Sequence, residues 1–305
     1  MSDITTVLGP DEPPPLLTPE QITHLAYHGW LPLTLPVHLN DAVTRLSQAA
    51  RAFFDQHVSL KRSQYPARRG TECGFYECPG EKEYLTIRYD TNATSYLEEC
   101  ARLLWRDAAN YLHRVLCDIS RAGEYNVHAW SSLVKHGLEL PADDSSLDTV
   151  TSLLRMFRYL PDSGVAAQHV DNGLLTLCVG EGQGLQVLDR SIATPPTWVD
   201  VDGPVVLVGD LTRALLRNRV RAGVHRVVGN PCGRSSLVFA LRPYLKGIID
   251  LAAFGGKGLV DTRDYCTAVK GSKVNVNAAR EVREQQQKDR EHSSCASASG
   301  TNGFG

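Results

Sequence analysis

The sequence contains no apolar run long enough to cross a lipid bilayer, and its N-terminus is acidic and proline-rich rather than hydrophobic. These absences argue against a membrane span and against a secretory signal. The formal net charge is only −2, so neither sign dominates, and neither a nucleic-acid partner nor a membrane partner is indicated. We therefore expect a cytoplasmic protein, and the sequence leaves its oligomeric state open.

Cysteine occurs at eight positions, but no two of them have the Cys-x-x-Cys spacing that is typical of metal and redox motifs. Cys73 and Cys78 flank a Gly-Phe-Tyr-Glu segment, but no second Cys or His pair accompanies them. We interpret the cysteines as reduced thiols, in keeping with a cytoplasmic protein.

The length of 305 residues is sufficient for one large domain with a full hydrophobic core. Composition and periodicity divide the chain into consecutive segments. These are a mobile Pro-rich lead (1–17), a helical and strand region (18–150), a β-rich core (151–245), a helical segment (246–292) and a disordered tail (293–305). Residues 18–292 are expected to form one globular unit.

Helix signals dominate the first half. Thr18 is a suitable N-cap, Pro19 suits the first helical position, and Gln21 completes a capping box. A strand is expected from Trp30 onward. Apolar residues then recur at helical spacing in two stretches: Val43, Leu46, Ala50, Phe53 and Phe54, and Leu97, Ala101, Leu104, Ala108, Leu112 and Leu116. We expect these two helices to pack against the outside of a sheet.

After Thr151 the pattern changes to short β runs separated by Gly, Pro and Asp, which is typical of a double-sheet jelly roll. The expected fold class is α+β, with a double-stranded β-helix core and flanking N-terminal and C-terminal helices. A charged amphipathic helix is expected over 277–288. Two interpretations of it stay open, a lid across the barrel mouth and a solvated packing helix.

His169 and Asp171 are two residues apart, so on a strand both side chains point to the same face. With ten histidines in 305 residues, roughly 0.7 His-x-Asp pairs arise by chance, so the pair alone says little. Two histidines and one carboxylate on one octahedral face are the protein ligands of a mononuclear non-haem iron(II) site. The third ligand must come from another strand, and His225 is the candidate.

The order of several segments is more informative than any one of them. They are Leu153–Pro161, Ala167–Thr176, Gly184–Leu188, Trp198–Val201, Val205–Asp210, His225–Val227 and Arg234–Pro243. From Thr151 onward the chain resembles the isopenicillin N synthase-like branch of the iron(II)/2-oxoglutarate-dependent oxygenases. Segments such as Gly80–Tyr84 and Asn275–Arg280 look like fungal members that act on secondary metabolites.

The resemblance implies that His169, Asp171 and His225 are catalytic residues that bind Fe²⁺, with 2-oxoglutarate and O₂ as co-substrates. It also implies that Arg234 and Ser236 hold the distal carboxylate of 2-oxoglutarate. Members of the family convert 2-oxoglutarate to succinate and, through a ferryl-oxo species, oxidise a C–H bond of a small-molecule substrate. Halogenating relatives replace the carboxylate ligand by a small residue, so Asp171 argues for oxygenation.

Four further residues are candidates for contacts in the site. Tyr159 matches a tyrosine that often contacts the same 2-oxoglutarate carboxylate, although Phe157 stands where plant members carry Asn. Alternation along the strand from Arg234 takes Ala240 inward, where relatives often have a large aromatic residue, so the substrate pocket would be roomier here. Arg88 or Arg158 would pair with an acidic group of the substrate, or would otherwise be a surface salt-bridge residue.

Two alternatives stay open. Isopenicillin N synthase and the ethylene-forming oxidase share the three ligands and the Arg-x-Ser motif but do not use 2-oxoglutarate. A non-catalytic jelly-roll binding protein would keep the barrel and lose at least one ligand, whereas this chain retains all three.

Overall fold

The computed structural model describes residues 14–68, 70–91, 94–191 and 195–271, together with Gln285. Most of the predicted lead, the predicted helix at 277–288 apart from Gln285, and the predicted tail lie outside the described residues. In the described part of the chain, no helix combines the length and the hydropathy of a membrane span.

A seven-stranded antiparallel sheet forms one half of the core. Across the sheet its strands are β1 (Trp30–Pro32), β9 (Val205–Val208), β6 (Leu175–Glu181), β11 (Arg234–Leu241), β4 (Leu153–Tyr159), β3 (Lys82–Ile87) and β2 (Gly74–Cys78). The sheet thus recruits three strands from the N-terminal half of the chain. Sequence patterning missed β3 because every residue of that strand is buried, so it lacks the alternation of a half-exposed strand.

A four-stranded antiparallel sheet forms the other half. Its strands are β5 (Ala166–His169), β10 (His225–Val227), β7 (Leu185–Asp189) and β8 (Thr197–Asp200). One cluster of buried side chains from both sheets fills the space between them, and it includes Trp30, Phe157, Val187 and Leu207. The predicted fold class, a jelly-roll core with flanking helices, is confirmed.

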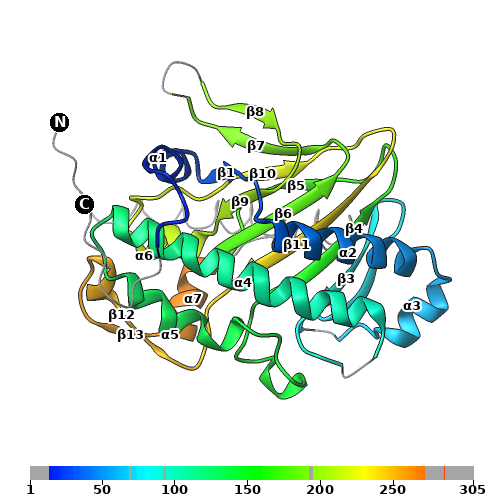
Figure 1. Cartoon of the computed structure of the whole chain (residues 1–305), viewed down its shortest axis with the longest axis horizontal. Helices are drawn as coiled ribbons and strands as arrows, with labels where there is room; N and C mark the ends of the chain where they lie inside the picture. Colours follow the sequence, from blue (N-terminus) through cyan, green and yellow to red (C-terminus); the bar gives the residue numbers. More distant parts are fainter. Residues whose placement is uncertain (1–13, 69, 92–93, 192–194, 272–284, 286–305) are drawn as a thin grey trace, which may run out of the picture.

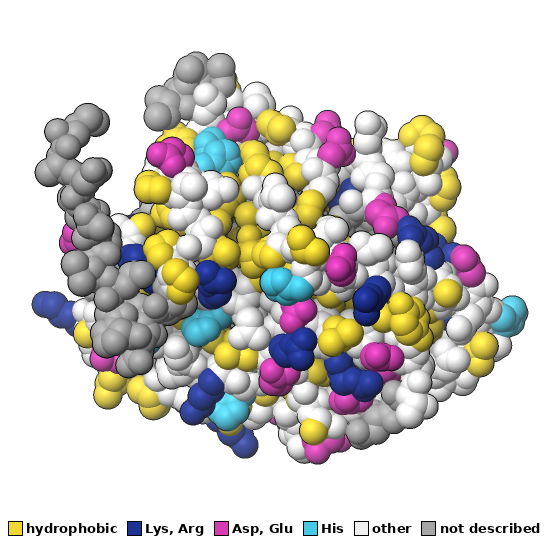
Figure 2. Space-filling model, in the orientation of Figure 1, with side chains coloured by type: hydrophobic (Ala, Val, Ile, Leu, Met, Phe, Trp, Pro, Cys, Tyr) yellow, Lys and Arg dark blue, Asp and Glu magenta, His cyan; other side chains and the backbone are white. Residues whose placement is uncertain are grey.

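Helices cover the outer face of the seven-stranded sheet, where α2 (Val37–Phe54) and α4 (Tyr96–Ala122) run across β11 and β6 (Figure 1). Both apolar stripes predicted from the sequence are buried here. On this face the acidic and basic side chains at the surface are interspersed (Figure 2). The Trp105 ring of α4 packs edge-on against Phe239 of β11 at 5.1 Å, which fixes the strand against the helix.

The predicted capping box is present at the start of α1 (Pro19–His28). The Thr18 hydroxyl accepts a hydrogen bond from the Gln21 backbone N–H, and the Gln21 side chain accepts one from the Thr18 backbone N–H. The remaining short helices and 3₁₀ turns are α3 (Val58–Gln64), α5 (Ser131–Val134), α6 (Asp210–Leu215), η1 (Val127–Trp130), η2 (Lys135–Gly137), η3 (Asp144–Ser146) and η4 (Leu251–Phe254).

The segment after the core differs in part from the helix expected over 246–292. A small two-stranded sheet, β12 (Ile248–Asp250) and β13 (Leu259–Asp261), comes before α7 (Thr262–Lys270). Gly255 and Gly258, at φ 74° and 89°, lie in the connection between its strands, in a backbone conformation that glycine adopts without strain.

The packing of Trp105 between α4 and β11 should make a large contribution to the free energy of unfolding. Trp105 is completely buried, so Trp105→Ala should lower the free energy of unfolding by about 3–5 kcal/mol, as measured by urea denaturation. The control is Val37→Ala at a position that is 79% exposed, where a change within about 0.5 kcal/mol is expected. Equal effects of the two substitutions would contradict this packing.

Candidate metal centre

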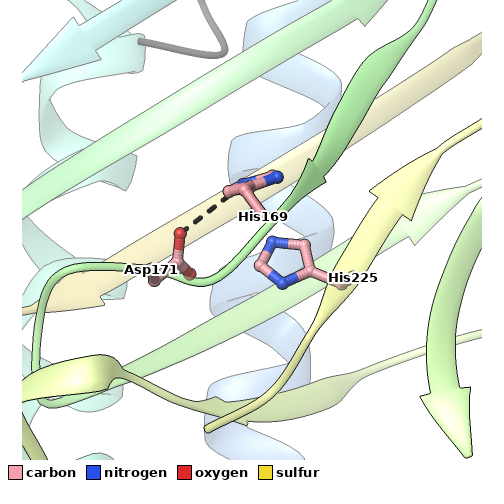
Figure 3. A group of neighbouring side chains, drawn as sticks. All are labelled: His169, Asp171 and His225. Carbon is pink, nitrogen blue, oxygen red and sulfur yellow. Dashed lines mark ion pairs between the residues drawn. The ribbon is translucent and has the colours of Figure 1, made fainter. Parts of the chain in front are cut away.

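Three side chains converge where β5 meets β10. His169 ends β5, Asp171 follows two residues later, and His225 begins β10. The two strands are antiparallel neighbours, and His225 is the direct partner of His169 in the register. Figure 3 shows the two rings and the carboxylate grouped together. The structure therefore brings together the three residues predicted from the sequence.

The group is compact enough to hold one ion. One ligand atom from each residue lies within 4.8 Å of the other two, and no other such group occurs among the described residues. The ring centroids of His169 and His225 are 4.1 Å apart, and His169 Nε2 is 3.8 Å from a carboxylate oxygen of Asp171. His225 is buried, whereas His169 and Asp171 are partly exposed, so the centre can be reached from solvent.

Backbone carbonyls fix the tautomer of both imidazoles. The Nδ1 atom of His169 is 2.7 Å from the carbonyl oxygen of Ala167, and that of His225 is 3.0 Å from the carbonyl oxygen of Gly223. Because a carbonyl only accepts, each Nδ1 carries the proton and donates it. Each Nε2 lone pair is thereby left for a metal, an arrangement that is usual for histidine ligands.

The electrostatics favour the protonation states that metal ligands need. Burial, together with the neighbouring His225, lowers the pKa of His169, which keeps the imidazole neutral. Burial raises the pKa of Asp171, but His225, His169 and the Thr176 hydroxyl outweigh it, so the pKa of this carboxyl is lowered on balance. The lowered pKa values thus favour a neutral His169 imidazole and an ionised Asp171 carboxylate, the states that metal ligands need.

Arg234 and Ser236 lie on β11, between β4 and β6, and both are buried. The Arg234 guanidinium donates to the carbonyl oxygen of Gly182 and passes over Gly180, where a Cβ atom would lie 1.7 Å from Nη2. Its Nε is buried without a hydrogen-bond partner. Cys178 belongs to the buried cluster between the sheets, and burial raises its pKa while Arg234 lowers it and Asp171 raises it.

Tyr159 is the register partner of Arg234 on one side and of Lys82 on the other, so the three side chains share the inner face of the sheet. Lys82 is 1% exposed, donates to the carbonyl oxygen of Val165 at 2.9 Å and lies 5.6 Å from the centre of the Tyr159 ring. The sequence reasoning missed Lys82. No local alternation marks its inward position, because every residue of β3 is buried.

The other predicted residues lie in different surroundings. Arg88 is buried and donates to the backbone carbonyls of Thr71, Leu147 and Val150. Arg158 lies on the opposite face of β4 from Tyr159, where it pairs with Asp55 and Glu83 beside α2. Ala240 is buried on β11, at the end of the strand away from Arg234.

Two inward-facing arginines were not singled out from the sequence. Arg155 alternates with Phe157 and Tyr159 on β4, and Arg242 follows β11 in the same alternation as Arg234 and Ala240. Both contact one carboxylate, that of Glu72, at 3.2 Å and 2.7 Å respectively.

No family model matches the chain. Among curated proteins, a 2-oxoglutarate-dependent dioxygenase, frbH from Dothideomycetidae sp. (strain 11243), is 41% identical over 86 residues. That match spans 25% of this chain and about a quarter of the relative's length.

Solved structures match over most of the chain. A full-length Neurospora crassa protein in complex with alpha-KG has a TM-score of 0.62 at 16% identity, over 83% of this chain and 89% of that one. A putative 2OG-Fe(II) oxygenase family protein from Caulobacter crescentus has a TM-score of 0.64 at 20% identity, over 82% and 91%. Rice dioxygenase for auxin oxidation has a TM-score of 0.60 at 19% identity, over 81% and 86%.

The chain therefore has the fold of the 2-oxoglutarate/Fe(II) oxygenases. The resemblance to that superfamily predicted from the sequence is confirmed, and the narrower isopenicillin N synthase-like branch stays a prediction.

The convergence of three ligand atoms predicts a metal site that depends on each of them. His225→Ala and His169→Ala should each weaken Mn²⁺ binding to the metal-free protein by more than ~100-fold. Substituting a residue that only hydrogen-bonds a metal ligand typically costs ~10–100-fold in affinity, and removing a ligand itself should cost more. Isothermal titration calorimetry measures the affinity. The control is His128→Ala, at an exposed histidine, which should bind Mn²⁺ as the wild type does. Unchanged affinity in both ligand variants would contradict the assignment.

Proposed function

We propose that this chain is a non-haem iron(II), 2-oxoglutarate-dependent oxygenase that oxidises a C–H bond of a small molecule. The observation that carries the proposal is the cluster of His169, Asp171 and His225, with both Nε2 lone pairs left for a metal. Its position on the fold of the 2-oxoglutarate oxygenases supports the same conclusion.

The donor set fits ferrous iron. Two neutral imidazoles and one carboxylate are the ligand types of the facial triad, and three ligands on one face leave three coordination positions for co-substrates. One carboxylate neutralises only part of the charge of Fe²⁺, so an anionic co-substrate is attracted to the centre. Iron with 2-oxoglutarate and O₂ would supply the oxidant for the C–H bond.

Arg234, Ser236, Tyr159 and Lys82 would hold the distal carboxylate of 2-oxoglutarate. The buried Nε of Arg234 is a donor without a partner, and a planar guanidinium matches a carboxylate with two parallel hydrogen bonds. The Ser236 and Tyr159 hydroxyls share its inner face, and the buried charge of Lys82 adds positive potential. The chain's part is thus to orient the co-substrate and to exclude water with the apolar residues between the sheets.

The retained Asp171 favours oxygenation over halogenation. We also propose a secondary-metabolite substrate and a cytoplasmic location. No disulfide joins the seven cysteines among the described residues, which include Cys73 and Cys78, and this supports a reducing compartment.

The central test is anaerobic addition of Fe²⁺ and 2-oxoglutarate, which should give a weak visible charge-transfer band. Arg234→Met should weaken 2-oxoglutarate binding by at least ~30-fold, because truncating one partner of a buried charge pair costs about 2 kcal/mol or more. Arg51→Met, at a half-exposed arginine on α2, is the matched control. Iron binding without a band would point to an oxidase that does not use 2-oxoglutarate, and no iron binding to a non-catalytic barrel.

The close approach of Arg234 to Gly180 predicts a second effect. Gly180→Ala introduces a Cβ atom 1.7 Å from Nη2, so the guanidinium must move. We expect 2-oxoglutarate affinity to fall by at least ~10-fold, about 1.4 kcal/mol, with Mn²⁺ affinity unchanged. Titration of 2-oxoglutarate into the Mn²⁺-loaded protein measures the loss, and wild-type affinity would show that Arg234 does not hold the co-substrate.

A further inference from the structure

A second cationic cluster lies beside the proposed metal centre. Arg155 Nη2 and Arg242 Nη1 converge on the two carboxylate oxygens of Glu72, at 3.2 Å and 2.7 Å. The stem of Arg242 runs against Gly173, where a Cβ atom would lie 2.9 Å from Cγ. Gly173 is two residues after Asp171, so the stem of Arg242 lies against the segment that carries the carboxylate ligand. The cluster therefore adjoins the reaction centre.

Positive charge exceeds negative charge in this cluster. Two arginines contact the single carboxylate of Glu72. Arg88 is a third buried arginine, and it donates to the backbone carbonyl of Thr71, the residue before Glu72. The Nη donors of Arg88 are engaged by backbone carbonyls, and Nε of Arg88 and Nε of Arg242 are both buried without a hydrogen-bond partner. A buried donor of this kind is costly unless a further acceptor meets it.

Glu72 is held in an unfavourable backbone conformation. Its φ is +63°, in the left-handed region that disfavours a residue with a Cβ atom. Its side chain is 45% exposed, so the carboxylate reaches the arginines from the solvent side. Glu72 therefore stands where the anionic group of an incoming molecule would meet the same two guanidinium groups.

Aromatic rings line the arginines on the interior side. The Arg155 guanidinium lies 5.1 Å from the Tyr84 ring centre and 5.8 Å from that of Phe157. Tyr84 in turn stacks on Tyr76 at 5.2 Å and contacts Phe157 at 5.4 Å. A cation next to a flat apolar wall suits a molecule that joins a carboxylate to an apolar, planar body.

We propose that Arg155 and Arg242 form the substrate's anion subsite, and that the substrate is an organic acid whose carboxylate takes the place of the Glu72 carboxylate. Its apolar part lies along Tyr84 and Phe157, toward the His169–Asp171–His225 centre. This inference rests on the proposed oxygenase function and names the substrate class of that site.

The test uses the Mn²⁺-loaded protein saturated with 2-oxoglutarate, in which paramagnetic relaxation of a probe's ring protons reports both binding and proximity to the metal. The probes are phenylacetate and its neutral isostere phenylacetamide. Wild type should bind phenylacetate at least ~10-fold more tightly than the amide, in line with a charge-assisted hydrogen bond. Arg155→Met and Arg242→Met should each abolish the preference, whereas Arg51→Met should keep it.

The Glu72→Gln variant tests whether the substrate carboxylate displaces the Glu72 carboxylate or whether Glu72 only holds the two arginines in place. Removing the competing carboxylate charge should raise phenylacetate affinity several-fold and leave phenylacetamide unaffected. The inference is overturned if metal and 2-oxoglutarate bind normally but wild type does not distinguish the two probes. It is also overturned if Glu72→Gln gives no gain while both arginine variants keep the preference. Failure of wild type to bind Mn²⁺ and 2-oxoglutarate would instead overturn the proposed function, and this inference with it.

Discussion

The register between β5 and β10 is the constraint on which the rest of the site depends. Pairing sets His225 opposite His169, and Asp171, two residues beyond the end of β5, completes the group. Because side chains alternate, a slip of one residue in β10 would turn His225 to the other face and remove one ligand. The same segments supply the carbonyls of Ala167 and Gly223 that accept from each Nδ1, so one register fixes both the position and the tautomer of the ligands.

The interior of the barrel is unusual in its charge. Lys82, Arg155 and Arg234 are all buried on the inner face of the seven-stranded sheet, although burying a charge is costly unless it is compensated. The surface over α2 and α4, by contrast, mixes both signs (Figure 2). A cationic interior is explained if the molecules that enter are anions. 2-Oxoglutarate would then compensate the charge at Arg234, and an acidic substrate would compensate the charge at Arg155 and Arg242. In this structure the Glu72 carboxylate pairs with those two arginines.

Sequence alone predicted the features that depend on local pattern. The helical stripes of α2 and α4 and the capping box of α1 follow from spacing, and the ordered motifs of the second half led to the jelly roll. Long-range pairing was harder to predict: β3 joins β4 because its fully buried residues fit between two strands, which no local alternation reveals. The two-residue period would also have separated Arg155, which faces inward with Tyr159, from Arg158, which faces α2.

The most direct test of this account is a crystal structure of the anaerobic complex with Fe²⁺ and 2-oxoglutarate. We predict one iron ion bound by Nε2 of His169, Nε2 of His225 and a carboxylate oxygen of Asp171, with the distal carboxylate of 2-oxoglutarate on Arg234. Iron bound through Nδ1 of either histidine, or 2-oxoglutarate bound away from Arg234, would contradict it.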